Sequence, residues 1–284
     1  MLSDRAPAEE RLVSGVRYPA FWGDLVAMAD IRIFSYLPNP RVWKALIAAE
    51  FCGVEVEVVG DKPANLSNWL WDFDARELTE SEKSVDSPNA RQSRRGFSGT
   101  LYKTDEFLKA HPYGTVPAAF SSDGQTGIFE SNSILRSVVR ASRVSHELYG
   151  RDPSEASRID SFLDAGLVFA REAQVYLLGM KSMTEETYER MLSAYEFYLS
   201  GIEQSLSEQD YIASANLTIA DICFVCDLSQ FLRERYMQQS LEPLGLSAIA
   251  VRIDEEYPHA YRHMLNLGRT GEFARHLGNY LDGL

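Results

Sequence analysis

The sequence predicts an α/β domain followed by an all-α domain. In the first half of the chain, β-rich runs such as IRIFSY and VEVEVV alternate with segments of helical spacing. After about residue 153, every segment has helical spacing and helical start signals. The chain has 284 residues, of which 45% are hydrophobic and 24% charged, so it is long enough to form sizeable cores in two domains.

The start of the α/β domain is a predicted βαβ unit. IRIFSY is β-rich, the segment from Asn39 to Cys52 has the Ala and Leu content of a helix, and VEVEVV alternates Glu with Val at the period of a strand. Gly53 directly follows the helical segment, where a glycine ends many helices. The short connection to the next strand is typical of such units.

The end of the α/β domain predicts a helix, a hairpin and a second helix. Thr104 is placed to cap TDEFLKA, and Pro112 follows it. TVPAAF and QTGIF, joined by SSDG, predict a β-hairpin. ESNSILRSVVRAS predicts a helix that begins at Glu130 or Ser131. Residues 31–141 therefore have the predicted order βαβαββα.

Three segments depart from this pattern. Residues 1–30 are predicted to be an N-terminal arm that docks on the body of the protein or on a partner subunit. Residues of about 61–104 form an insertion, with a packed aromatic anchor, Trp69, Trp71 and Phe73, followed by a mobile polar tip. Residues 142–153 are polar and predict a linker.

The all-α domain is predicted over residues 154–284. Long helices are expected from Ser154 to about Met180, from about Glu185 to Leu206 and from Thr218 to about Tyr236. Shorter helices are expected in YPHAYRHMLNL and TGEFARHLGNYL. LTIAD has the hydroxyl and acid of a capping box, so it is the best-defined helix start.

Charge and cysteine content exclude several functions. The net charge of -13 argues against nucleic-acid binding and gives no electrostatic reason to bind an anionic membrane. No apolar run predicts a membrane span, and 3 cysteines are too few for a disulfide framework, so we expect a cytoplasmic protein.

Cys223 and Cys226 are interpreted as buried helix residues. His259 and His263 have the spacing of metal ligands but no third ligand, so no metal is expected.

Three motifs in the same order resemble those of cytosolic glutathione transferases. HPYGTVPAAF is similar to the N-P-x-G-x-V-P-x-L segment, IFESNSIL to E-S-x-A-I-x-x-Y, and LTIADI to the capping motif of the helical domain. SYLPNPRVWKALIAAEFCGVEVEV most resembles the transferase-like domain of the gamma subunit of translation elongation factor one and its bacterial relatives. The resemblance covers most of the chain from Ile31 onward. It implies a thioredoxin-like N-terminal domain and glutathione as co-substrate.

The resemblance implies a glutathione site at Thr115, Val116, Pro117, Glu130 and Ser131. The backbone of Val116 would pair with the cysteinyl part of glutathione, and Pro117 would follow a cis peptide bond. Ser131 would bind the γ-glutamyl carboxylate at a helix N-terminus, and Glu130 would accept from the ammonium group. From the residues alone, the last two are better interpreted as a helix cap with a favourable acid.

Glutathione attacks as a thiolate, and the resemblance implies a hydrogen-bond donor for it after the first strand. Pro38 and Asn39 stand where family members carry serine or cysteine. Because proline has no donor, Asn39 is the first candidate catalytic residue, and Ser35 and Tyr36 are the alternatives. Asn39 followed by Pro40 is also typical of a helix start, so both interpretations stay open.

The predicted function is transfer of the glutathione thiolate to a small hydrophobic or aromatic electrophile, by a homodimer or by a heterodimer with a related transferase subunit. The electrophile pocket is expected between Leu37, the insertion and the long helices, with Phe169, Arg171 and Tyr176 as candidate residues. Arg91, Arg94 and Arg95 are interpreted as a solvated loop.

The narrowest form of the prediction is aryl ether cleavage, as in the bacterial glutathione-dependent β-etherases. The alternative is a non-catalytic subunit, or an assembly module like the elongation factor gamma subunit.

Overall fold

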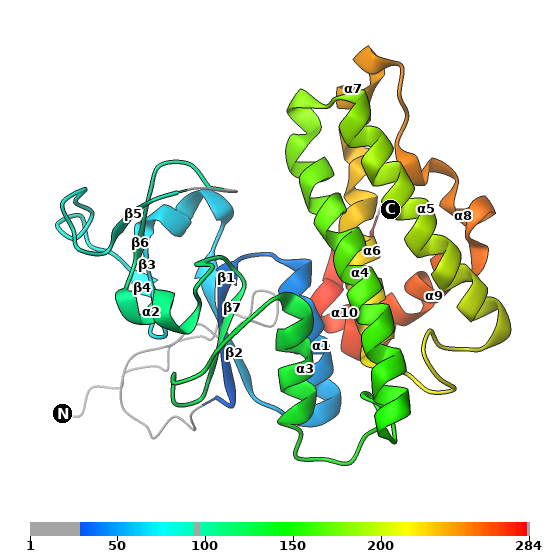
Figure 1. Cartoon of the computed structure of the whole chain (residues 1–284), viewed down its shortest axis with the longest axis horizontal. Helices are drawn as coiled ribbons and strands as arrows, with labels where there is room; N and C mark the ends of the chain where they lie inside the picture. Colours follow the sequence, from blue (N-terminus) through cyan, green and yellow to red (C-terminus); the bar gives the residue numbers. More distant parts are fainter. Residues whose placement is uncertain (1–28, 94–96, 283–284) are drawn as a thin grey trace, which may run out of the picture.

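A computed structural model describes residues 29–93 and 97–282 of the chain (Figure 1). Most of the predicted N-terminal arm, together with Arg94 and Arg95, lies outside the described residues. The structure has a mixed sheet covered by helices at its N-terminal end and a helical domain at its C-terminal end, so the predicted fold class is confirmed. None of the described helices combines the length and the apolar character that a bilayer-spanning segment needs.

The main sheet has the strand order β2-β1-β7-β8. β1 pairs in parallel with β2, and the other two pairs are antiparallel, as expected for a βαβ unit followed by a hairpin. The elements of this domain are β1 (Ile31–Tyr36), α1 (Pro40–Cys52), β2 (Val56–Asp61), α2 (Asp105–Ala110), β7 (Ala118–Ser121), β8 (Gly127–Phe129) and α3 (Ser131–Arg140).

Both ends of α1 have the predicted caps. The side chain of Asn39 accepts a hydrogen bond from the backbone N of Arg41, and Pro40 occupies the first helical position. Gly53 ends the helix with φ of 61°, a conformation that glycine adopts without steric cost.

The insertion has a small sheet of its own, which the sequence pattern did not predict. Its elements are η1 (Pro63–Asn68), β3 (Trp69–Trp71), β4 (Arg76–Glu77), β5 (Ala90–Gln92) and β6 (Thr100–Lys103), in the strand order β4-β3-β6-β5. Trp71 is fully buried against Phe34 and Phe107, which confirms the aromatic anchor. Figure 1 shows this sheet at the end of the molecule opposite the helical domain.

The helical domain is built around α6, whose side chains are almost all buried. A capping box between Thr218 and Asp221 begins this helix, as predicted. The α-helix ends at Phe231, five positions before the expected Tyr236, and continues as the 3₁₀ segment η3. Other bounds are α4 (Pro153–Gly179), η2 (Met180–Ser182), α5 (Glu185–Glu208), α6 (Ile219–Phe231), η3 (Leu232–Met237), α7 (Gln238–Leu241), η4 (Glu242–Leu244), η5 (Ile249–Arg252), α8 (Ile253–Glu256), α9 (Pro258–Gly268), α10 (Gly271–Leu277) and η6 (Gly278–Leu281).

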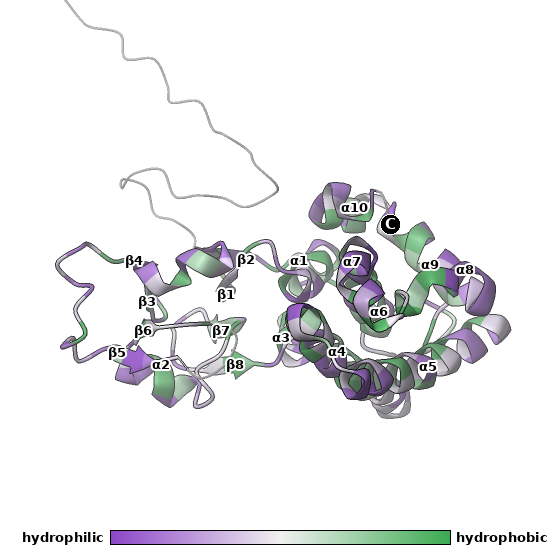
Figure 2. Cartoon of the chain, turned by 90° about the horizontal axis from the view of Figure 1, so that it is seen from above, coloured by the Kyte–Doolittle hydropathy of each residue, from purple (hydrophilic) through white to green (hydrophobic). Residues whose placement is uncertain are grey.

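One hydrophobic core runs through both domains. α1 and α3 lie between the main sheet and the helical domain, and α1 packs against α6 and α10 (Figures 1 and 2). Apolar residues of α1, such as Val42 and Ile47, belong to the same buried cluster as Cys223 and Cys226 of α6. The two cysteines are therefore buried helix residues, as predicted, and both are free thiols.

Candidate functional site

The strand register brings the predicted site residues to one edge of the main sheet. Phe34 of β1 pairs with Ala118 of β7, and Ala118 also pairs with Phe129 of β8. The end of β1, the start of β7 and the end of β8 therefore lie side by side. Each strand end carries predicted site residues. Ser35 and Tyr36 end β1, residues 115–117 directly precede β7, and Glu130 and Ser131 directly follow β8.

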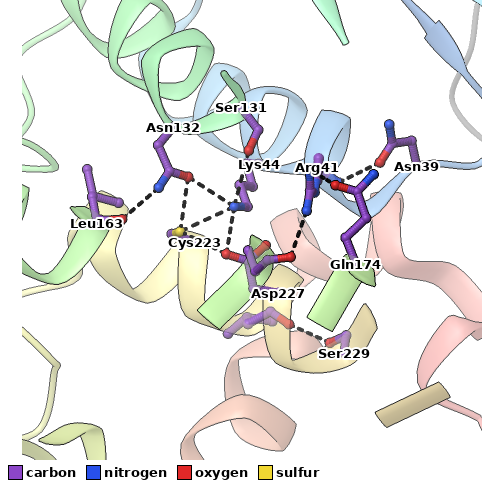
Figure 3. Close-up of polar contacts among 12 residues, drawn as sticks. Asn39, Arg41, Lys44, Ser131, Asn132, Leu163, Gln174, Cys223, Asp227 and Ser229 are labelled. Atoms are coloured by element: carbon purple, nitrogen blue, oxygen red, sulfur yellow. Dashed lines mark hydrogen bonds and ion pairs between the residues drawn. The ribbon is translucent and has the colours of Figure 1, made fainter. Parts of the chain in front are cut away.

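The predicted catalytic residues Asn39 and Ser35 are hydrogen-bonded to each other. The amide Nδ2 of Asn39 donates to Ser35 Oγ at 2.9 Å, and both side chains are fully buried. Asn39 Oδ1 accepts from the backbone N of Arg41 at 3.0 Å (Figure 3). The capping interpretation of Asn39 is thus confirmed. Its role as a thiolate donor stays a prediction. Because one of the two amide hydrogens of Asn39 is already donated to Ser35, the second is the one that could serve a thiolate.

Tyr36 is the third predicted donor, and it differs from the other two. Its side chain is half-buried, and the described residues offer its hydroxyl no hydrogen-bond partner. Burial raises the pKa of this hydroxyl, although the positive charge of Arg41 opposes the shift. The Tyr36 hydroxyl is therefore protonated at neutral pH and free to donate.

Arg41 is a candidate functional residue that the sequence analysis missed. Its guanidinium donates to Ala170 O at 2.8 Å and to Gln174 Oε1 at 3.3 Å, which ties the start of α1 to α4 (Figure 3). Its Nε is buried and finds no acceptor among the described residues. A cation in the first turn opposes the helix dipole, and this unfavourable placement was the available sequence signal.

The segment before β7 has the predicted backbone geometry. The Val116–Pro117 peptide bond is cis, as expected from the motif. Thr115 is exposed and Val116 is half-buried, whereas Pro117 is buried. The backbone at this position is thus accessible on the side of Thr115 and Val116.

Lys103 is a second residue that the sequence analysis missed. Its ammonium group donates to Gly114 O at 2.6 Å and lies 4.4 Å from the centre of the Trp71 ring. Burial, with a smaller contribution from Arg91, lowers the pKa of Lys103 to about 8. A half-buried cation beside the segment 114–117 has no carboxylate partner among the described residues, and so is available to an anionic ligand.

Glu130 has the most unusual backbone conformation of the described chain. With φ of 66° and ψ of 125°, it is the one non-glycine residue with positive φ among the described residues. Its side chain is exposed and makes no capping hydrogen bond to α3. The conformation therefore has a cost that helix capping does not explain, and such strain is typical of functional sites.

Ser131 and Asn132, at the start of α3, lie on a buried polar network. Lys44 Nζ lies 2.7 Å from Asp227 Oδ2, 3.0 Å from Asn132 Oδ1, 3.3 Å from Cys223 Sγ and 3.5 Å from Ser131 Oγ (Figure 3). Burial raises the pKa of the Cys223 thiol to about 12, so this sulfur stays protonated. The network joins α1 and α3 to α6 directly beneath the predicted γ-glutamyl position.

Two of the expected pocket residues are core residues instead. Phe169 and Tyr176 are buried, and the Tyr176 hydroxyl donates to Glu234 Oε2 at 3.0 Å, so the prediction that they line an electrophile pocket is wrong. The reason is that they occupy the inward face of α4, against Phe231. Arg171, on the same helix, is exposed.

The remaining candidates have ordinary partners. Arg91 pairs with Asp105, and His263 Nε2 lies 2.9 Å from the capping residue Asp221. His259 is exposed. Within residues 29–93 and 97–282, no group of His, Cys, Asp and Glu side chains is arranged to hold a metal ion.

Comparison with known proteins agrees with the fold. Residues 159–268 match the family model "Glutathione S-transferase, C-terminal domain". The chain is 27% identical over 249 residues to elongation factor 1-gamma 2 of Oryza sativa subsp. japonica, covering 85% of this chain and 47% of that protein. It is also 27% identical over 196 residues to the glutathione S-transferase-like protein LUC7 of a Fusarium species, covering 67% of this chain and 73% of that protein. The chain thus spans about half the length of the elongation factor relatives it matches.

Solved structures of glutathione S-transferases share the fold. A Methylobacillus flagellatus enzyme with glutathione bound superposes with a TM-score of 0.57 at 15% identity, covering 86% of this chain and 96% of that chain. A Phanerochaete chrysosporium glutathione transferase with oxidized glutathione gives a TM-score of 0.60 at 15% identity, covering 89% and 95% of the two chains. At this level of identity, the similarity establishes the fold and leaves the chemistry to be argued from the site.

Proposed function

We propose that this chain binds glutathione and uses the thiolate to attack a small apolar or aromatic electrophile. The chain has the fold of the glutathione S-transferases, and its residues 159–268 match the model of their C-terminal domain. The observation that carries this proposal is the backbone of Glu130. A positive φ immediately before the N-terminus of α3, in a residue whose exposed carboxylate caps nothing, is explained by a ligand.

Each end of glutathione has a complementary group at the sheet edge. The γ-glutamyl carboxylate binds Ser131 and the N-terminus of α3, and its ammonium group binds Glu130. The cysteinyl backbone pairs with Val116 beside the cis peptide bond, next to the exposed Thr115. The glycyl carboxylate binds Lys103, the half-buried cation beside Gly114.

The thiolate lies at the N-terminus of α1 in this arrangement. The helix dipole and the guanidinium of Arg41 both favour a negative charge there, and the Tyr36 hydroxyl donates to it. Asn39 adds its second amide hydrogen, while Ser35 fixes the orientation of the amide. The sulfur then bonds to an electrophilic carbon, the leaving group departs with its electron pair, and the thiol proton passes to solvent. Aryl ether cleavage is the narrowest form of this proposal, in which the leaving group is a phenolate.

The proposal includes a dimer. Tyr113 is 71% exposed beside the glutathione segment, and an apolar groove between α4 and α5 is lined by Phe162, Ala165 and Phe197. An exposed aromatic residue on one domain and an apolar groove on the other fit a two-fold pairing of related chains. Sedimentation of the purified protein as a monomer at micromolar concentration would contradict this pairing.

A reducing, cytoplasmic location also belongs to the proposal. Its support is that Cys52, Cys223 and Cys226 are buried free thiols. The net charge of -13 supports the absence of a nucleic-acid partner.

The second candidate function is a non-catalytic assembly module. Two observations favour it: Ser35 and Asn39 satisfy each other away from solvent, and the elongation factor 1-gamma relatives align along most of this chain. Such a module would keep the fold and bind glutathione without activating its thiol.

Calorimetric titration with glutathione, followed by an assay of thiol consumption with activated aromatic halides, tests the proposal and separates the two functions. Binding with turnover supports the enzyme. Binding without turnover favours the assembly module, and absence of binding contradicts the glutathione site itself.

A further inference from the structure

We infer that the electrophile carries a carboxylate or a similar planar anion, and that Arg233 binds this group. The inference rests on the proposed function and names the substrate class of the same site. It starts from a guanidinium that has no acidic partner among the described residues of a strongly acidic protein, and that lies beside the aromatic residues bordering the start of α1.

The Arg233 guanidinium lies against two aromatic rings, and its edge has no partner among the described residues. Its Cζ lies 4.4 Å from the ring centre of Tyr236 and 4.7 Å from that of Tyr280. Stacking on aromatic rings holds the guanidinium plane in place but leaves the in-plane N–H groups unused. The described residues offer these N–H groups no hydrogen-bond acceptor and no carboxylate. A fixed planar fork of donors matches the geometry of a carboxylate.

The acid next to Arg233 in the chain is engaged elsewhere. Glu234, next along the chain, is fully buried and accepts hydrogen bonds from Ile249 N at 3.1 Å and from Ala250 N at 2.6 Å. The partly buried Arg136, by contrast, pairs with Asp160 at 2.6 Å. The chain has 41 acidic and 28 basic residues, so acidic partners for a guanidinium are abundant. Arg233 is half-buried and has no such partner in residues 29–93 and 97–282.

Arg233 lies on the side of α1 where the thiolate is proposed. The ring of Tyr280 packs edge-on against Trp43 of α1, with 4.8 Å between ring centres. The pKa of Tyr280 is raised mainly by burial, and the hydroxyl of Tyr36 adds to this shift, so the two tyrosines lie within electrostatic range of each other. Tyr36, the proposed thiolate donor, is thus linked through Tyr280 to Arg233. In the proposed complex the aromatic ring of the electrophile lies against Tyr280, between the sulfur and the guanidinium.

A matched pair of electrophiles tests the inference. In 4-chloro-3-nitrobenzoate and 4-chloro-3-nitrobenzamide, the glutathione sulfur bonds to the ring carbon that carries chlorine, chloride leaves with the bonding pair, and the thiol proton goes to solvent. The two molecules differ in the charge of one group. We expect the wild-type protein to have a kcat/KM for the benzoate about tenfold higher than for the benzamide, a preference that one charge-assisted pair supplies.

Arg233→Gln removes the charge and is expected to reduce this benzoate-to-benzamide ratio to about one. Arg233→Lys keeps the charge but not the planar fork, so its ratio should be intermediate. Arg252→Gln is the control, because Arg252 is exposed and pairs with Glu255. A wild-type ratio of about one, or the wild-type ratio retained in Arg233→Gln, overturns the inference.

A binding measurement makes the result independent of turnover. Equilibrium dialysis of 3-nitrobenzoate and 3-nitrobenzamide, with the protein saturated by S-methylglutathione, measures the same preference without chemistry. If the benzoate binds about tenfold more tightly and neither chloride is displaced, the inference stands and the proposed catalysis fails. Equal binding of the two ligands overturns the inference whatever the turnover. The ratio compares two ligands on one protein, so a loss of stability in Arg233→Gln does not change its meaning.

Discussion

Lys44 of α1 and Asp227 of α6 form an ion pair of 2.7 Å in which each side chain is only 1% exposed. The pair joins the α/β domain to the helical domain, and Asn132 and Cys223 complete its surroundings. Burial alone would lower the pKa of Lys44. The negative charge of Asp227 and its hydrogen bond outweigh this effect, so the pKa of Lys44 is raised. This contact adds to the apolar packing of α1 against α6 and α10 that holds the two domains together.

Removing one partner of this pair is predicted to be costly. Lys44→Met leaves the Asp227 carboxylate buried without a counter-ion, so the free energy of unfolding should fall by about 3–5 kcal/mol. The double variant Lys44→Met/Asp227→Leu should recover much of that loss, because neither charge is then buried. Urea titrations of the three proteins measure the effect. A double variant no more stable than the single one would contradict this account.

Asn39→Ala is predicted to reduce activity far more than stability. Loss of the cap costs about 1 kcal/mol, whereas loss of the amide donor weakens stabilisation of the thiolate. Thr184→Ala is the matched control, because Thr184 caps α5, on an exposed part of the helical domain. Thermal melts and kcat/KM should be measured on both variants. If Asn39→Ala loses no more activity than its loss of stability accounts for, Asn39 only caps the helix.

Glu130→Gly is predicted to change stability and affinity in opposite directions. Glycine tolerates positive φ, so the strain at this position is relieved and the free energy of unfolding should rise by up to about 1 kcal/mol. The carboxylate that binds the glutathione ammonium group is lost at the same time, so affinity should fall. Calorimetric titration and thermal melts test both signs. Unchanged affinity for glutathione would show that the strain serves another purpose.

Glutathione binding is predicted to take up a proton near pH 8. The pKa of Lys103 is about 8 in the free protein, mainly because of burial, so close to half of the molecules carry a neutral lysine at that pH. A bound glycyl carboxylate favours the charged form and raises this pKa, so about half a proton should be absorbed per site. S-methylglutathione avoids any contribution from the thiol. Titrations in buffers of different ionisation enthalpy measure the uptake, and its persistence in Lys103→Met would rule out Lys103 as the source.

The sequence was sufficient to predict the elements whose signals are local. The first strand, the caps at Asn39 and Gly53 and the capping box at Thr218 all arise from neighbouring residues, and each lies where it was expected. The second strand begins at Val56, two residues after the expected Val54. The insertion sheet was not predicted because its strands are only two to four residues long, and because the pairing of β3 with β6 joins residues that are distant in sequence. Short strands of this kind leave no periodic pattern.

The cations of the site could not be predicted in the same way. Lys44 and Arg41 stand in a helix whose other residues look ordinary, and only the packed structure brings them against Asp227 and Ala170. The error at Phe169 and Tyr176 has the same origin, because the sequence does not specify which face of α4 is turned inward. Charge and aromatic character were visible in the sequence, but the direction of each side chain depends on tertiary packing.

The pKa of the glutathione thiol in the complex tests the central claim most directly. Free thiols of this kind have a pKa of about 8.5, and ultraviolet absorbance of the thiolate, followed against pH with protein in excess, reports the value in the complex. The account predicts saturable binding and a clearly lower pKa, and Tyr36→Phe should move the value back toward that of free glutathione. Glutathione that binds with its thiol pKa unchanged, or that does not bind at all, would contradict the account.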